Sequence, residues 1–180
     1  MVYVFLADGF EIIEALSPVD MMRRAGIEVK TVGVSGTVVE SSCGVKVTAD
    51  ILPENVDIRK ADAVVIPGGM HGVTNLEKSD FVKDCLKTAS DEGRLVCAIC
   101  AGPSLLGKLG LLDGKKAISY PGFEQYLTGA QISSDYVVKD GNFITAKGAG
   151  VSVDFGLEIV AALKGRDISD KVRASIQCRP

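Results

Sequence analysis

Short apolar runs that each end in a glycine-containing turn constrain this chain more than any other feature. They cover residues 2–7, 63–66 and 95–99, and a helical pattern of apolar residues comes after each turn. Strands that are apolar along their whole length are typical of a sheet covered on both faces, and parallel neighbours need helical crossovers. The alternation therefore predicts an α/β fold with a mostly parallel central sheet.

Weaker patterns supply the remaining elements of one predicted domain, residues 1–180. Further strands are expected at 27–34 and 117–118, with hairpins formed by 38–39 and 45–48 and by 136–139 and 143–146. Helices are expected over 12–23, 79–93, 103–109 and 153–163, with a final short helix from residue 169. The segment directly after Pro67-Gly68-Gly69 is expected to be a loop.

Composition and charge exclude several classes of function. Hydrophobic residues make up 47% of the 180, which excludes a disordered chain. The net charge is −3 and no long run of like charge occurs, so nucleic-acid and anionic-membrane partners are disfavoured. No apolar stretch reaches the ~18 residues of a membrane span, and the start lacks the basic region of a secretory leader. We therefore expect a cytoplasmic protein.

Cysteine, histidine and glycine spacing argue against bound cofactors. Five cysteines at irregular spacing do not resemble a disulfide framework and are interpreted as reduced thiols. A single histidine and the lack of a second Cys-x-x-Cys leave no zinc-site pattern. The glycine-rich segments lack the spacing of phosphate-binding loops, which disfavours a flavin or nucleotide carrier. We predict neither a metal nor a cofactor.

Three polar segments are expected to meet at one edge of the sheet. In an open α/β sheet, ligands bind outside the carboxyl ends of the strands. Segments 8–14, 67–72 and 100–103 each follow a predicted strand. We expect a functional site where they converge.

Cys100 is the strongest candidate for a reactive group. It lies where an apolar strand turns directly into a helix that begins near Pro103, an arrangement that resembles a nucleophile elbow. The N–H groups of a helix N-terminus favour the thiolate, which predicts a pKa below the usual ~8.5. The alternative is a buried cysteine that fills a tight corner. Cys97 completes a Cys-Ala-Ile-Cys sequence, but its position inside the predicted strand argues against a redox pair.

A nucleophilic thiol needs a group that handles protons. Glu11 and Glu14, three residues apart at the start of the first helix, are better placed than His71, which lies in the expected loop. Without a catalytic role, the acids would stabilise the helix N-terminus and His71 would be solvated. A carboxyl buried beside a thiolate is pushed toward its protonated form and can then donate a hydrogen bond or move a proton.

Backbone N–H groups are candidates for binding an oxyanion. Those of Gly68, Gly69 and Ala101 lie in the segments expected to converge. The alternative role of the two glycines is to form a tight turn.

Longer motifs along the chain support a family resemblance. They are Ala7-Asp-Gly-Phe-Glu-Ile-Ile-Glu14, Pro18-Val-Asp-Met-Met-Arg-Arg-Ala-Gly-Ile27, Val64-Val-Ile-Pro-Gly-Gly69, Ala98-Ile-Cys-Ala-Gly-Pro103 and Asp154-Phe-Gly-Leu-Glu-Ile-Val160. Together they resemble the ThiJ/PfpI superfamily, in particular its DJ-one branch, which includes a parkinsonism-associated human member.

The resemblance implies a fold, an assembly and a set of site residues. The fold is a flavodoxin-like three-layer α/β sandwich, and the assembly is a homodimer. Cys100 is implied to be the nucleophilic, oxidation-sensitive cysteine, with Glu14 as the protonated carboxyl beside it. The backbone of Gly69 and Ala101 is implied to lie near the sulfur, and Arg24 at the dimer-side rim of the site.

The sequence departs from the family pattern at three positions. Ala101 stands where protease-like members carry a histidine after the nucleophile, which disfavours a Cys-His peptidase. Tyr120 precedes Pro121 where some members have a histidine, so Tyr120 is a candidate hydrogen-bond donor at the rim of the site. His71, in the expected loop after Gly69, is a further candidate for the rim. Cys43 replaces an arginine often found in the small hairpin.

Two functional hypotheses result from the resemblance. The first is a cofactor-independent glyoxalase III-like lyase or deglycase that uses Cys100 and Glu14 on methylglyoxal-type α-oxoaldehydes or their early adducts. The second is a redox-sensing, oxidative-stress chaperone in which Cys100 is oxidised to sulfinate.

Overall fold

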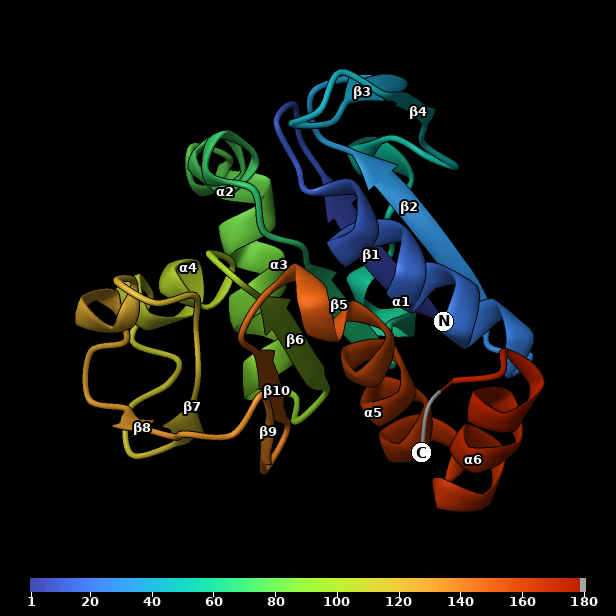
Figure 1. The fold of residues 1–180 in the computed structure, drawn as a ribbon. Coiled ribbons are helices and arrows are strands. Elements are labelled where there is room, and N and C mark those ends of the chain that lie inside the picture. The colour runs from blue at the N-terminus through green and yellow to red at the C-terminus, as the bar shows by residue number, and fades with distance from the viewer. Residues whose placement is uncertain (179–180) are drawn as a thin grey trace.

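A six-stranded sheet forms the centre of the computed structural model, which describes residues 1–178 (Figure 1). The strand order is β2-β1-β5-β6-β10-β9; the first five strands run parallel, and the edge strand β9 pairs antiparallel with β10. The mostly parallel sheet predicted from the sequence is thus confirmed. The strands of this sheet are β1 Val2–Leu6, β2 Val29–Gly33, β5 Ala63–Ile66, β6 Leu95–Ile99, β9 Val137–Asp140 and β10 Phe143–Ala146.

Two short strand pairs lie outside the main sheet. β3 (Val38–Glu40) and β4 (Lys46–Thr48) form the expected small hairpin. β7 (Lys116–Ala117) pairs in parallel with β8 (Gln131–Ile132), a strand that the sequence patterns did not indicate.

Helices cover both faces of the sheet and produce the expected three-layer sandwich. One core cluster joins one face to α1, α5 and α6, and a second joins the other face to α2, α3 and α4. The alternation of β1 shows the division, because Val4 packs into the first cluster and Phe5 into the second. The helices are α1 Ile12–Arg24, α2 Met70–Glu77, α3 Asp80–Asp91, α4 Pro103–Lys108, α5 Ser152–Lys164 and α6 Arg166–Ser175.

Helix α2 corrects one expectation, because the segment after Gly69 is helical rather than a loop. Its pattern is short and interrupted by Gly72, so local propensity does not indicate a helix. Packing decides the conformation: Val73 and Leu76 are buried in the core. Gly72 permits the approach, since a Cβ there would lie 2.7 Å from the backbone nitrogen of Phe10.

Other helix ends follow local chemistry. Ser79 accepts a hydrogen bond from the Val82 N–H at 3.4 Å and caps α3, as its position predicts. The last helix begins at Arg166, three residues before the expected Ser169.

Within residues 1–178, no helix is both long and apolar enough to span a membrane.

Strand order positions a crevice at one edge of the sheet. The chain leaves β1 for β2 on one side and later returns to β5 on the other side of β1. Such a reversal opens a crevice at the carboxyl ends of the two strands that flank it, β1 and β5. The segment after β6 comes beside them, because β6 pairs with β5.

Candidate functional site

A strained turn presents Cys100 directly after β6. Its φ of 63° lies in the left-handed region, which non-glycine residues occupy uncommonly and at a cost in energy. Two backbone hydrogen bonds of 2.8 Å hold the turn. The Cys100 N–H donates to the carbonyl of Ala146, and the Cys100 carbonyl accepts from the N–H of Tyr120. This geometry matches the elbow expected from the sequence.

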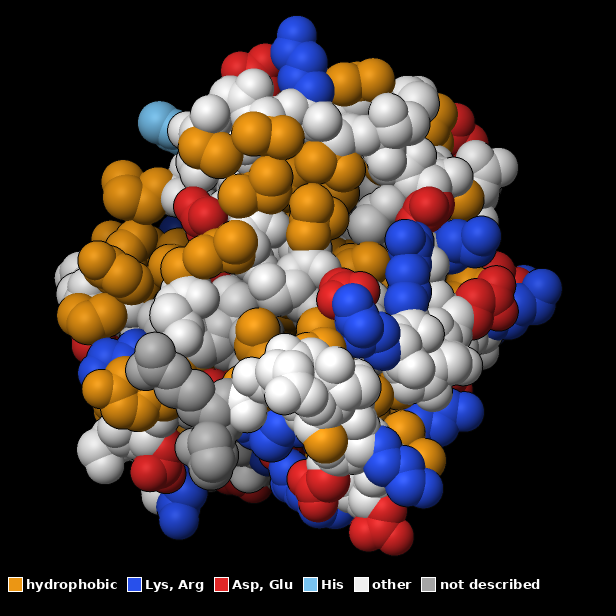
Figure 2. Space-filling view, turned by 45° about the vertical axis from the view of Figure 1, so that its right-hand side comes forward, with side chains coloured by type: hydrophobic (Ala, Val, Ile, Leu, Met, Phe, Trp, Pro, Cys, Tyr) orange, Lys and Arg blue, Asp and Glu red, His pale blue; other side chains and the backbone are white. Residues whose placement is uncertain are grey.

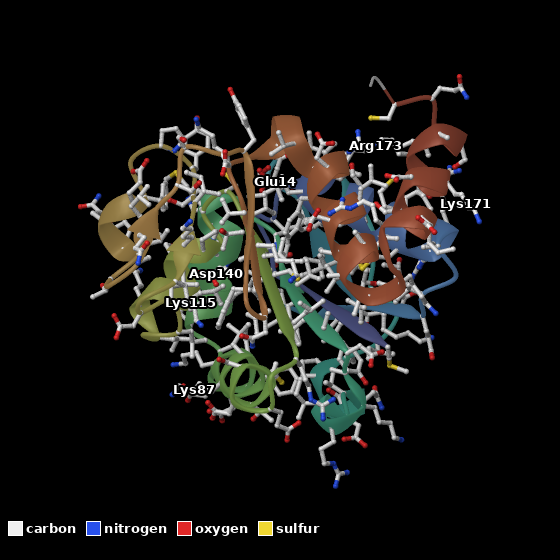
Figure 3. All side chains as sticks on the ribbon, turned by 90° about the horizontal axis from the view of Figure 1, so that it is seen from below. Glu14, Lys87, Lys115, Asp140, Lys171 and Arg173 are labelled. Atoms are coloured by element: carbon white, nitrogen blue, oxygen red, sulfur yellow. The ribbon has the colours of Figure 1, made fainter. Side chains whose placement is uncertain are left out.

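Glu14 meets Cys100 from the first turn of α1. The Glu14 side chain is 1% exposed, and Figure 3 shows it inside the molecule, whereas Lys87 and Lys171 lie at the periphery. Its Oε2 accepts a hydrogen bond from the Gly68 N–H at 2.9 Å, and its carboxyl is also hydrogen-bonded to the Cys100 side chain. Of the two acids considered from spacing, Glu14 is therefore the one paired with the thiol.

Gly68 leaves the space in which this pair meets. A Cβ at position 68 would lie 2.7 Å from the Cys100 Cβ, 3.1 Å from its Sγ, and against Oε2 of Glu14. The same glycine uses its N–H on Glu14, so that N–H is not free for an oxyanion. Of the three predicted backbone donors, Gly69 and Ala101 remain, and the N–H groups of both face the sulfur of Cys100.

Burial controls the protonation of the pair. Loss of hydration raises the pKa of Glu14 from 4.5 to about 7, against hydrogen bonds from Cys100 and Gly68 that favour the carboxylate. Burial also raises the pKa of the Cys100 thiol, to about 12, and the negative charge of Glu14 adds to the effect. The expected lowering of this pKa by a helix N-terminus was therefore wrong, because the thiol is half-buried beside a carboxyl.

A pocket of about 300 Å³ opens onto the sulfur. Tyr120 lines it, as its candidacy for the rim implied. Met70, Phe123 and Ala149 also line it, and sequence reasoning missed them because none carries a titratable group. The remaining lining residues are Glu11, Glu14, Gly69, Cys100 and Ala101.

A serine that the sequence did not indicate orients the second acid. The Ser42 hydroxyl, from the turn between β3 and β4, donates to Oε2 of Glu11 at 3.0 Å. Glu11 remains at the pocket wall, and its charge raises the pKa of Glu14 slightly further.

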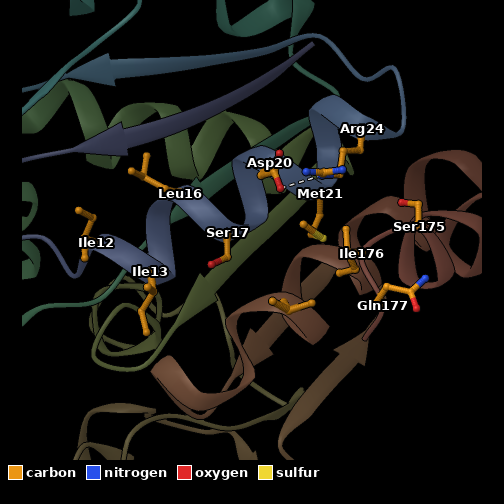
Figure 4. Close-up of a pocket in the computed structure, with 11 residues that line it drawn as sticks. Ile12, Ile13, Leu16, Ser17, Asp20, Met21, Arg24, Ser175, Ile176 and Gln177 are labelled. Atoms are coloured by element: carbon orange, nitrogen blue, oxygen red, sulfur yellow. Dashed lines mark hydrogen bonds and ion pairs between the residues drawn. The ribbon is translucent and has the colours of Figure 1, made fainter. Parts of the chain in front are cut away.

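The structure does not bring His71 and Arg24 to this pocket. His71 is exposed on α2 and lines a separate polar hollow. Arg24 lies in the last turn of α1, ten residues or about 15 Å along the helix from Glu14. It forms an ion pair with Asp20 at 2.8 Å beside a hollow of about 680 Å³ between α1 and the end of α6 (Figure 4). That hollow is the larger one, but its lining residues include no cysteine, histidine or glutamate.

Cys100 is the cysteine whose thiol meets Glu14 at the pocket. Cys97 is fully buried in β6, where burial raises the pKa of its thiol, and Cys85 is buried on α3. Cys43 is exposed and lies 3.2 Å from the Ser41 hydroxyl. Among residues 1–178, no three His, Cys, Asp or Glu side chains gather as a metal-ligand set.

Comparisons with known proteins decide the family. The model of the DJ-1/PfpI family matches residues 1–162. The chain belongs to this family. The DJ-1/PfpI protein dj-1beta of Drosophila melanogaster is 38% identical over 167 residues, 91% of this chain and 89% of that protein. The glutathione-independent glyoxalase DJR-1.2 of Caenorhabditis elegans is 31% identical over 156 residues, 86% of this chain and 83% of that protein.

Solved DJ-1 structures share the fold. Oxidized Toxoplasma gondii DJ-1 superposes with a TM-score of 0.95 at 34% sequence identity, covering 99% of this chain and 98% of that one. The family resemblance and the three-layer fold predicted from the sequence are thereby confirmed.

Proposed function

We propose that this protein is a cofactor-independent enzyme that converts methylglyoxal-type α-oxoaldehydes to hydroxy acids. The observation that carries the proposal is the hydrogen-bonded pair of Cys100 and Glu14 at the base of an open pocket. A glutathione-independent glyoxalase among the relatives supports it. Hydrolysis of early oxoaldehyde adducts is the related deglycase reaction that the same groups would perform.

The first step joins substrate and enzyme. Burial is the larger cause of the raised thiol pKa, so the proton rests on sulfur and the Glu14 carboxylate takes it up as the sulfur attacks. The Cys100 thiolate attacks the aldehyde carbon, and the carbonyl electron pair moves to oxygen. The N–H groups of Gly69 and Ala101 stabilise that oxygen, and Glu14 delivers its proton to give a hemithioacetal.

The second step moves a proton within the substrate. The Glu14 carboxylate removes the proton from the former aldehyde carbon and returns it to the neighbouring carbon. The hydroxyl proton of the former aldehyde passes to the neighbouring oxygen, which leaves a thioester beside a new hydroxyl group. Water then hydrolyses the thioester, releases the hydroxy acid and restores the thiol. The net reaction adds one water to the oxoaldehyde, so no external oxidant or reductant is required.

Methylglyoxal consumption with lactate detection tests this function. We expect turnover in the wild type and in Cys43→Ser, the matched control at an exposed cysteine. Cys100→Ser should lose turnover, and Glu14→Gln should lower kcat by roughly 100- to 10,000-fold, the range for loss of a general acid–base. Stoichiometric consumption, or equal rates in wild type and Cys100→Ser, would contradict the proposal.

A second candidate function is redox sensing by the same cysteine. Cys100 is partly exposed and faces the N–H groups of Gly69 and Ala101, and Glu14 can donate a further hydrogen bond when protonated. These donors would stabilise the oxygens of a sulfinate formed by two equivalents of peroxide. A relative of the same fold, Toxoplasma gondii DJ-1, has been solved in an oxidized form.

Peroxide titration followed by mass spectrometry separates the two functions. Sensing predicts that two oxygens are added at Cys100 before any other cysteine and that Glu14→Leu slows this, because the donor is removed. It also predicts that oxidation changes the binding of client proteins. Oxidation that only abolishes turnover would favour the enzyme.

We also propose a homodimer that acts in the cytoplasm, where the reducing environment keeps Cys100 a thiol. Figure 2 shows hydrophobic side chains gathered on the upper part of one face. Three large hydrophobic residues of α1 and the β3–β4 hairpin are exposed: Ile13 by 47%, Val38 by 54% and Val45 by 48%. We call these three residues the α1 face. A patch of this kind favours burial against a second copy.

A further inference from the structure

An apolar cleft adjoins the Cys100 pocket, and the proposed reaction of methylglyoxal does not use it. Its volume is about 420 Å³. It is lined by Tyr120 and Pro121, by Tyr136 just before β9, and by residues 147–151 after β10. Tyr120 and Ala149 line both the cleft and the Cys100 pocket. The two hollows are therefore neighbouring parts of one site.

The cleft offers aromatic surface to a ligand. Tyr120 is 50% exposed and Tyr136 is 62% exposed, although both rings have large apolar faces. The Tyr120 ring lies against Gly148, where a Cβ would be 3.4 Å from Cδ2 of the ring. Flat groups stack favourably on such rings, so the cleft suits a flat apolar ligand group.

Lys147 supplies the charge in this cleft. The backbone N–H of Lys147 donates to the Tyr136 carbonyl at 2.9 Å, and the side-chain Nζ lies 4.9 Å from the Tyr136 ring centroid. Lys108 lies over Tyr126 in the same manner, but it is neutralised by Glu77 at 2.8 Å. Lys147 has no such carboxylate partner within residues 1–178, so its charge is free to meet an anionic group.

We propose that this cleft binds the far end of the substrate, a flat apolar group that ends in a carboxylate. The inference rests on the proposed function, because the oxoaldehyde end of the same molecule must reach Cys100. Tyr136 stacks on the flat group and Lys147 pairs with the carboxylate, so both residues determine specificity without touching the reacting atoms.

The test compares three aldehydes: methylglyoxal, phenylglyoxal and 4-carboxyphenylglyoxal. In Lys147→Met, we expect the ratio of kcat/KM for the carboxylated aldehyde to that for phenylglyoxal to fall about tenfold, and Lys147→Arg should retain it. Tyr136→Leu should lower the ratio of kcat/KM for phenylglyoxal to kcat/KM for methylglyoxal about fivefold. The matched control is Lys139→Met, on the same hairpin but beside a different hollow, and it should leave both ratios unchanged.

Binding of unreactive products keeps this inference separate from the proposed function. Calorimetry on Cys100→Ser should show 4-carboxymandelate binding about tenfold more tightly than mandelate, and the added Lys147→Met change should remove the difference. If the wild type turns over no aldehyde but this difference is seen, the reaction fails and the binding cleft stands. An unchanged ratio in Lys147→Met, or equal binding of the two mandelates, would overturn the cleft.

Discussion

Glu14 is the residue at which folding and chemistry make opposite demands. Its burial keeps a proton available beside Cys100, and the same burial makes the ionised carboxylate unfavourable in the folded state. Because the folded pKa of about 7 lies above the unfolded value of 4.5, the folded state binds this proton more tightly. The resulting stability is complete below pH 4.5 and is lost as pH rises through 7.

Glu14→Gln should remove this pH dependence while keeping an acceptor for the Gly68 N–H. The shift from 4.5 to about 7 corresponds to about 3 kcal/mol in the free energy of unfolding. As the pH rises from 4.5 to 8, the free energy of unfolding of the variant should therefore rise by about 3 kcal/mol relative to that of the wild type. Urea unfolding of both proteins across this range measures the gain. A difference that stays constant with pH would show that Glu14 is already ionised in the folded protein.

At this scale the sequence patterns identified Cys100, and the family resemblance chose Glu14 as its partner. Cys100 could be found because a strand, a small-residue turn and a proline are local signals. Spacing could not separate Glu14 from Glu11, since the choice depends on which side chain reaches Gly68 across the crevice. The pKa of Cys100 was predicted in the wrong direction because burial beside a carboxyl is a tertiary property.

Among the elements, those flanked by glycine-containing turns were predictable and those set by packing were not. The buried strands β1, β5 and β6 follow their apolar runs closely. Helix α2 and strand β8 did not stand out, because each is short and weakly patterned. The misassignment of α2 also placed His71 in a loop, whereas the helix holds it away from the Cys100 pocket.

The crossing of α1 and α5 provides a test at the scale of elements. A Cβ at Gly156 of α5 would lie 2.8 Å from the Cα of Pro18 on α1. Alanine favours a helix by about 1 kcal/mol over glycine, but the overlap with backbone outweighs this gain. Gly156→Ala should therefore lower the free energy of unfolding by about 1–2 kcal/mol, as measured by urea denaturation. Ala161→Gly on the same helix measures the propensity contribution, and a stabilised Gly156→Ala would contradict the crossing geometry.

For the whole molecule, the proposed dimer gives a direct test of the α1 face. Light scattering coupled to size-exclusion chromatography should report twice the mass of one chain for the wild type. Ile13→Asp should yield monomers, because it places a charge in an apolar interface. Ile132→Asp is the matched control, since Ile132 is 48% exposed on β8. A monomeric wild type, or equal masses for the two variants, would remove this face as the interface.

The layering of the whole molecule followed from the sequence because apolar strands separated by helical patterns allow few arrangements. Strand order did not follow, since the pairing of β1 with both β2 and β5 is a long-range property. The convergence of three segments at one edge was a consequence of topology, and the structure places all three there.

The division of the site between buried strands and surface turns bears on how such a protein changes over evolutionary time. Cys100 directly follows β6 and Gly68 comes two residues after β5, so most changes at these positions would disturb folding as well as the proposed chemistry. Tyr136 lies in an exposed bend before β9 and Lys147 in the partly exposed loop after β10, and substitutions in such surface segments usually alter stability by less than about 0.5 kcal/mol. Under the proposed function and the inferred cleft, substitutions at Tyr136 and Lys147 would alter which substrates are accepted at little cost in stability, whereas substitutions at Cys100 or Gly68 would alter the reaction and the fold together.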